Sequence, residues 1–264
     1  MVRDLLIRGM LSGVVAGLLA FGVAKIYGEP QVDRAIAFEE QHAKAQASTQ
    51  EHADTQASAQ QHEHGDDEEE LVSRKVQSTT GLLTAVAVYG AAMGGLFALA
   101  FAFLHGRVGD MSPRWLSLLL AVAAFVAIYY VPSLKYPASP PAVGAPDTIA
   151  YRTGLFFLMI VVSLGGLVFA VAASRHLAPR FGGLNAALIG AGLFAAVVVI
   201  AQLVLPDINE VPAEFPTIVL WKFRMASLAI QVLMWTTLGL LFGWLAERLL
   251  SGRQAIARLK PSSA

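Results

Sequence analysis

Six long apolar runs constrain this chain more than any other feature of its sequence. An α-helix needs about 20 apolar residues to cross the hydrocarbon core of a bilayer, and each run meets that test. Charged residues make up 14% of the chain, against roughly 25% in soluble domains. The sequence therefore predicts an all-α membrane protein with six transmembrane helices, over residues 5–27, 80–104, 115–133, 154–174, 184–205 and 225–246.

The first run could be taken for a signal peptide, because two basic residues, Arg3 and Arg8, lie at its start. The run is long, however, and residues 22–27 offer no small-x-small cleavage site. We therefore expect an uncleaved first helix.

Basic residues gather on the segments that would share one side of the membrane with both chain ends. The opposite side would hold two acidic loops, residues 28–79 and 206–217. Because Lys and Arg favour the cytoplasmic side, this distribution predicts that both ends are inside. The basic residues on the inner segments are Arg3, Arg8, Arg107, Arg114, Arg175, Arg180, Arg248, Arg253, Arg258 and Lys260.

The six runs also predict three helical hairpins in tandem. The outer connection of each hairpin contains a proline, Pro30, Pro132 or Pro206. Matching positions in successive hairpins lie roughly 72 residues apart. The second helix of each hairpin carries small residues, which let membrane helices approach closely. We therefore expect residues 1–264 to form one polytopic membrane domain.

The acidic outer loop, residues 28–79, contains four of the six histidines of the chain. We expect this loop to be disordered or helical. The chain has no cysteine, so a metal would be bound by imidazole, carboxylate, thioether or backbone oxygen. Candidate ligands are Glu39 and His42, which could share one helical face, and His62 and His64. The loop either captures metal ions weakly or is a solvated spacer, since an Ala/Gln/Ser decapeptide repeats within it.

Residues 131–153, which we call the cap, hold five of the twelve prolines. Proline lacks the amide donor of a helix, so we expect the helix to stop here and a rigid outer segment to follow. The residues that give the cap its structure are Pro132, Pro137, Pro140, Pro141 and Gly144.

Charged residues converge on the outer ends of the predicted helices. Ionisable groups near membrane depth are costly and usually face partners or water. These residues form either an ion-pair girdle that ties hairpins together or a gate or ligand site, with Glu210 and Glu214 pairing with Arg152 and Arg224. The transport and gating candidates are Lys135, Asp147, Arg152, Glu210, Glu214 and Arg224.

Enzymatic motifs are absent from the sequence. It has no nucleophile elbow, P-loop, His-Glu-x-x-His or paired acids at catalytic spacing. We therefore expect no catalytic residue, no permanently bound cofactor and no nucleic-acid partner. The remaining classes of protein are a channel, a carrier or a subunit of one.

The most distinctive residues lie in the cap, in the last outer loop and around the second helix. Through them the chain resembles the CbtA family of proposed cobalt-transporter membrane subunits. Glu39 and His42 also fit that family's acid followed by histidines after the first helix. The matching residues are Val72-Ser73-Arg74, Gln77, Thr80-Gly81-Leu82, Gly94-Gly95-Leu96-Phe97, Pro132, Leu134-Lys135-Tyr136-Pro137, Pro140-Pro141-Ala142-Val143-Gly144, Thr148-Ile149, Arg152-Thr153, Leu205-Pro206, Asn209-Glu210-Val211-Pro212, Phe215-Pro216, Leu220-Trp221 and Phe223-Arg224.

This resemblance implies uptake of Co²⁺ across the bacterial cytoplasmic (inner) membrane, linked to cobalamin supply. It also implies a small CbtB-like partner with one membrane helix and a histidine-rich end; the chain could in addition form oligomers in the lipid bilayer. Two alternatives stay open. One is a membrane receptor or scaffold for a metal-binding partner, without its own pathway. The other is a membrane-embedded enzyme, for which Asp147, Asp207 and Glu210 are the candidate acids.

Overall fold

The computed structural model describes residues 1–54 and 73–259, and the side chains of residues 1–45 and 73–252. Within these residues the chain is helical and has no strand. The structure confirms the all-α fold with six helices long and apolar enough to cross a membrane: Val2–Ala45, Arg74–Leu104, Pro113–Lys135, Pro146–Phe181, Gly183–Val204 and Thr217–Gly252. The orientation of these helices in the membrane stays a prediction.

The first helix does not end near Pro30, as the sequence had suggested. It runs through α1 (Val2–Val23), a π-helical turn η1 (Ala24–Gly28) and α2 (Glu29–Asp54) without a break. A proline removes a regular i→i−4 hydrogen bond, but the widened turn η1 has already left that pattern where Pro30 arrives. The first part of the acidic loop is therefore an extension of the first helix.

The third helix likewise continues through its proline. It comprises α5 (Pro113–Ala124), a π-helical turn η3 (Phe125–Tyr130) and α6 (Val131–Lys135), with Pro132 two residues beyond the widened turn. The helix therefore ends at Lys135, two residues beyond the predicted end at residue 133. Of the cap, only residues 136–148 lie outside α-helix, and they include the short 3-10 helix η4 (Pro146–Thr148).

The remaining helices fix the positions of Lys222 and Arg224. A short α3 (Arg74–Val76) and π-turn η2 (Gln77–Gly81) lead into α4 (Leu82–Leu104), and α7 (Ile149–Phe181) turns at Gly182 into α8 (Gly183–Val204). The last helix comprises α9 (Thr217–Thr237), η5 (Leu238–Phe242) and α10 (Gly243–Leu259). It begins after Pro216, earlier than predicted, so Lys222 and Arg224 lie inside it rather than before it.

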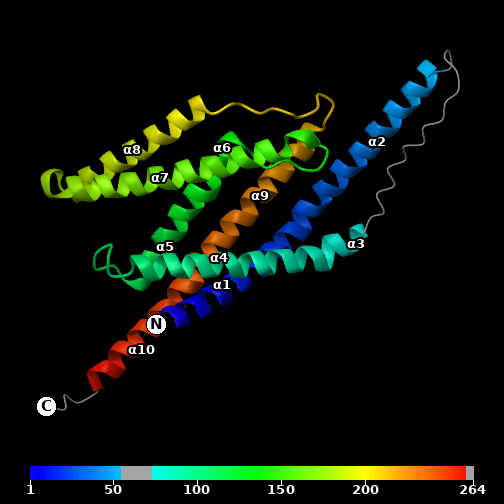
Figure 1. Ribbon diagram of the computed structural model, residues 1–264. Helices are drawn as coiled ribbons and strands as arrows, with labels where there is room; N and C mark the ends of the chain where they lie inside the picture. Colours follow the sequence, from blue (N-terminus) through cyan, green and yellow to red (C-terminus); the bar gives the residue numbers. More distant parts are fainter. Residues whose placement is uncertain (55–72, 260–264) are drawn as a thin grey trace.

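The helices pack as an uneven bundle (Figure 1). The combined helix α9–α10 contacts α1, α2 and α5, whereas α7 and α8 pack on each other and reach the rest of the bundle mainly through α6 and η3. Figure 1 shows the start of α1, the end of α10 and the α7–α8 turn at one end of the bundle, with the cap, α2 and the α8–α9 loop toward the other. The outer segments predicted to converge are therefore neighbours in space.

Candidate functional site

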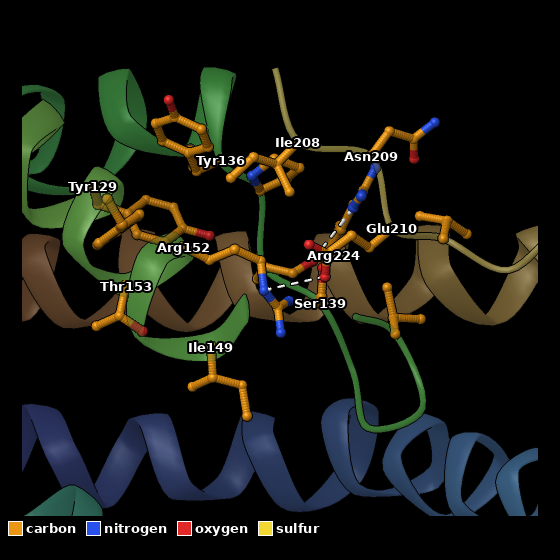
Figure 2. Close-up of a pocket in the computed structure, with 16 residues that line it drawn as sticks. Tyr129, Tyr136, Ser139, Ile149, Arg152, Thr153, Ile208, Asn209, Glu210 and Arg224 are labelled. Carbon is orange, nitrogen blue, oxygen red and sulfur yellow. Dashed lines mark hydrogen bonds and ion pairs between the residues drawn. The ribbon is translucent and has the colours of Figure 1, made fainter. Parts of the chain in front are cut away.

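The cap and the α8–α9 loop border a half-open cavity of about 430 Å³. Figure 2 shows side chains from both segments, and from α7 and α9, turned toward this space. Three of the predicted gating candidates, Arg152, Glu210 and Arg224, line it. The complete lining is Tyr129, Ser133, Tyr136, Pro137, Ala138, Ser139, Val143, Ile149, Arg152, Thr153, Phe156, Ile208, Asn209, Glu210, Val211 and Arg224.

Glu210 joins the α8–α9 loop to the cap through one carboxylate oxygen. Its Oε2 accepts hydrogen bonds from the Ala145 backbone N–H at 2.9 Å and from the Thr148 hydroxyl at 2.8 Å. Arg152 Nε forms an ion pair with the same oxygen at 3.3 Å, drawn as a dashed line in Figure 2. We call these four residues, Ala145, Thr148, Arg152 and Glu210, the Glu210 latch.

The latch holds Glu210 in its charged form. The Ala145 N–H, then the Thr148 hydroxyl and the charge of Arg152 lower the pKa of the Glu210 carboxyl below its ordinary value. Partial burial acts in the opposite direction and does not reverse the shift. Hydrogen bonds to a carboxylate favour its ionised state, so Glu210 stays an anion at neutral pH.

Gly144 explains why the Arg152 guanidinium can reach this position. Its φ is +108°, a conformation that residues with a Cβ rarely adopt. A Cβ at Gly144 would lie 2.1 Å from Arg152 Nη1, and Arg152 Nη2 donates to the Ala145 carbonyl at 3.3 Å. The guanidinium therefore lies directly against the cap backbone, where only glycine leaves room.

A second tie between the same two segments is formed by Lys135. Its ammonium pairs with Asp207 and donates to the Gln202 carbonyl at 2.7 Å, while the Tyr136 hydroxyl donates to the Pro206 carbonyl at 2.9 Å. The Lys135 side chain is 7% exposed. The sequence placed Lys135 and Asp207 at the same end but gave no signal that they form a pair.

The other charged candidates behave differently. Arg224 donates through Nε to the Ala138 carbonyl at 3.3 Å and forms no ion pair with any residue that the structure describes. Glu214 and Asp147 are exposed, and neither has an ion-pair partner within residues 1–45 and 73–252. Of the four residues predicted to form ion pairs with one another, the described structure pairs Arg152 with Glu210 and leaves Glu214 and Arg224 unpaired.

The cap prolines differ in their burial. Pro132 and Pro140 are buried, whereas Pro137 is half-buried and Pro141 is exposed. The Pro140 carbonyl accepts from the Val143 N–H at 3.3 Å. Val143 then packs in a small core with Ala35, Phe215, Val219 and Leu220, which joins the cap to α2 and α9.

The metal-ligand candidates lie beside this core. The His42 ring packs on Phe38 with centroids 4.2 Å apart, and Phe38 meets Phe215 at 5.1 Å. Glu39 is exposed on the same helix. Among the residues whose positions are described, no group of three His, Asp or Glu side chains could hold a metal ion. His62 and His64 lie outside the described residues.

Comparison with known proteins identifies a family. The family model described as "Probable cobalt transporter subunit (CbtA)" matches residues 2–247. No curated protein and no solved structure matches the chain. The match therefore includes both segments that border the cavity.

Proposed function

This chain belongs to the CbtA family, and from that premise we propose that it is the membrane subunit of a system for the uptake of Co²⁺ linked to cobalamin supply. The family is described as a probable cobalt transporter subunit, and six helices of the chain are long and apolar enough to cross a membrane. The proposal includes the bacterial inner membrane, with both chain ends inside.

The partner belongs to the same proposal. A subunit acts with at least one other chain, and we propose a small protein with one membrane helix and a histidine-rich end. Imidazoles supplied by that partner would add to Glu39 and His42 at the outer end of the first helix, since neutral imidazole suits Co²⁺.

The Glu210 latch is the observation that carries the proposed mechanism. It joins the two outer segments that border the cavity, and its bonds are ionic or hydrogen-bonded rather than apolar. A divalent cation that reaches Glu210 competes with Arg152 for the carboxylate, because both are attracted to the same charge. Release of Arg152 would separate the α8–α9 loop from the cap and open the outer mouth.

Uptake of Co²⁺ by the Glu210→Gln variant tests this mechanism. Glutamine keeps the shape but lacks the carboxylate charge that an arriving cation must bind, so we expect uptake to fall about tenfold or more, as for a lost charged hydrogen bond. The matched control is Glu40→Gln, which removes an exposed carboxylate from α2 and should leave uptake unchanged. Normal uptake by Glu210→Gln would show that the latch is not part of the pathway.

The scaffold alternative differs in what the chain does alone. A scaffold has no pathway of its own, so purified chain in proteoliposomes would not accumulate Co²⁺. We expect accumulation, increased by the partner and reduced by Ni²⁺ or Zn²⁺ only where these ions share the pathway. No accumulation with or without the partner would contradict the proposed function.

A further inference from the structure

The cavity under the cap carries more positive than negative charge. Two guanidinium groups, Arg152 and Arg224, line it, against the single carboxylate of Glu210. Glu210 is already paired with Arg152 at 3.3 Å. The charge of Arg224 is therefore left without a counter-ion among the residues that the structure describes.

The Arg224 guanidinium has hydrogen-bond donors that no described residue accepts from. Its only hydrogen bond within the described residues runs from Nε to the Ala138 carbonyl, so both terminal nitrogens of the guanidinium are free to bind another group. The residue lies in the second turn of α9, inside a predicted membrane span. An ionisable group at such a position is costly unless it meets a partner or water.

Neutral donors surround the same space. Tyr129, Ser139 and Asn209 line the cavity, and their side chains make no hydrogen bond to any described residue. Figure 2 shows them around Arg152, Glu210 and Arg224. Together with the free nitrogens of Arg224, they provide hydrogen-bond donors from four different segments.

The rest of the wall is apolar. Tyr136, Pro137, Ile149, Phe156 and Ile208 form it. A volume of about 430 Å³ lies within the usual range of roughly 300–1,000 Å³ for small-molecule sites. The cavity thus combines an excess positive charge, free donors and apolar walls.

We propose that this cavity binds the carboxylate or phosphate group of a partly apolar molecule, with Arg224 as the counter-charge and Tyr129, Ser139 and Asn209 as hydrogen-bond donors. A guanidinium matches both anions because its planar N–H groups bind two oxygens at once.

Two sources offer this chemistry at the outer mouth. One is the headgroup phosphate of an anionic lipid, and the other is a soluble carboxylate, including one that carries cobalt as a chelate. Either anion also competes with Glu210 for Arg152. Binding therefore weakens the Glu210 latch, and the Glu210→Gln variant should bind the anion more tightly than the natural chain does.

Binding to the purified full-length chain tests the proposal. One arm titrates citrate and cobalt citrate into protein in neutral detergent by calorimetry. The other compares thermal unfolding in nanodiscs of phosphatidylcholine alone and of phosphatidylcholine with phosphatidylglycerol. A charged hydrogen bond contributes enough for its loss to weaken binding about tenfold or more, so Arg224→Gln should lose that much affinity, or lose the stabilisation by phosphatidylglycerol.

Two controls distinguish loss of a specific binding site from a general loss of positive charge. Lys222→Gln removes an exposed positive charge two residues away on α9, outside the cavity lining, and should bind as the natural chain does. Ser139→Asp and Ser139→Asn differ only in charge at an exposed cap position. Their binding therefore tests the site even if Arg224→Gln does not fold. Aspartate should abolish binding and asparagine should retain it.

The outcomes identify the source or overturn the site. Binding of citrate that depends on Arg224 and Ser139 assigns a soluble carboxylate, and the same dependence for phosphatidylglycerol assigns a lipid. No binding in either arm, or equal losses in Arg224→Gln and Lys222→Gln, overturns the proposal. Neither arm measures transport. The anion-binding proposal can therefore be refuted while the proposed Co²⁺ uptake is upheld, and the proposed uptake can be refuted while anion binding is upheld.

Discussion

Two contacts in this molecule are built in opposite ways: the crossing of α1 with α4, and the junction of the cap with the α8–α9 loop. At the crossing, backbone lies on backbone, since a Cβ at Gly13 would fall 1.9 Å from the Gly90 carbonyl oxygen. At the junction, Glu210 and Asp207 pair with Arg152 and Lys135. The first contact depends on shape and the second on charge.

The difference bears on which part can move. Close backbone packing tolerates little displacement, because interiors are densely packed and a small shift creates clashes or voids. Ion pairs can exchange partners when another charge arrives. We therefore assign the α1–α4 crossing to a fixed frame and the junction to the part that opens.

The largest effect is expected from Gly13→Ala. The added methyl group would meet the Gly90 backbone, which cannot rotate away as a side chain can. Overpacking of this kind costs about 1–3 kcal/mol or more, so folded protein in the membrane should fall sharply. Abundance and size-exclusion profile measure it; an unchanged profile would show that the helices can separate.

Gly192→Ala in α8 is the matched control. A Cβ at that position meets no atom within 4 Å, and alanine favours helix more than glycine does. Its abundance should equal or slightly exceed that of the natural chain. A loss as large as that of Gly13→Ala would remove the distinction between the two contacts.

A smaller effect is expected from Gly144→Ala, at the junction. Both the positive φ and the contact with the Arg152 guanidinium oppose a side chain there. Backbone strain of this kind costs about 1–3 kcal/mol, confined to the cap. We expect a folded protein with reduced Co²⁺ uptake.

The comparison variant for the cap is Gly154→Ala, since a Cβ there meets nothing within 4 Å. Its uptake should be normal. If Gly144→Ala instead prevents folding altogether, the cap belongs to the fixed frame and not to the moving part.

The smallest effect concerns pH. The folded state lowers the pKa of Glu210, so the latch is fully present above the ordinary carboxyl pKa of about 4.3 and is lost only as pH falls through the lower folded value. Uptake between about pH 5 and 8 should therefore show no titration of Glu210. A midpoint in that range that disappears in Glu210→Gln would contradict the assigned charge state.

The sequence by itself determined the six apolar helices and the family. Crossing a bilayer requires a long apolar run, which is a local property that composition reveals. It also placed Arg152 and Glu210 at the same end of the bundle, because both lie in connecting segments predicted to share one side of the membrane. The predicted end of the first helix was wrong at Pro30, since the widened turn before that proline depends on backbone geometry that residue types do not specify.

Only the tertiary structure decided which charges meet. Arg152 pairs with Glu210 and Lys135 pairs with Asp207, whereas Arg224 lines the cavity without a described carboxylate partner. Such pairing depends on where the cap backbone passes, and that path follows from Gly144, whose missing Cβ admits the Arg152 guanidinium. Contacts between segments far apart in the chain depend on packing in three dimensions, and no local pattern carries that information.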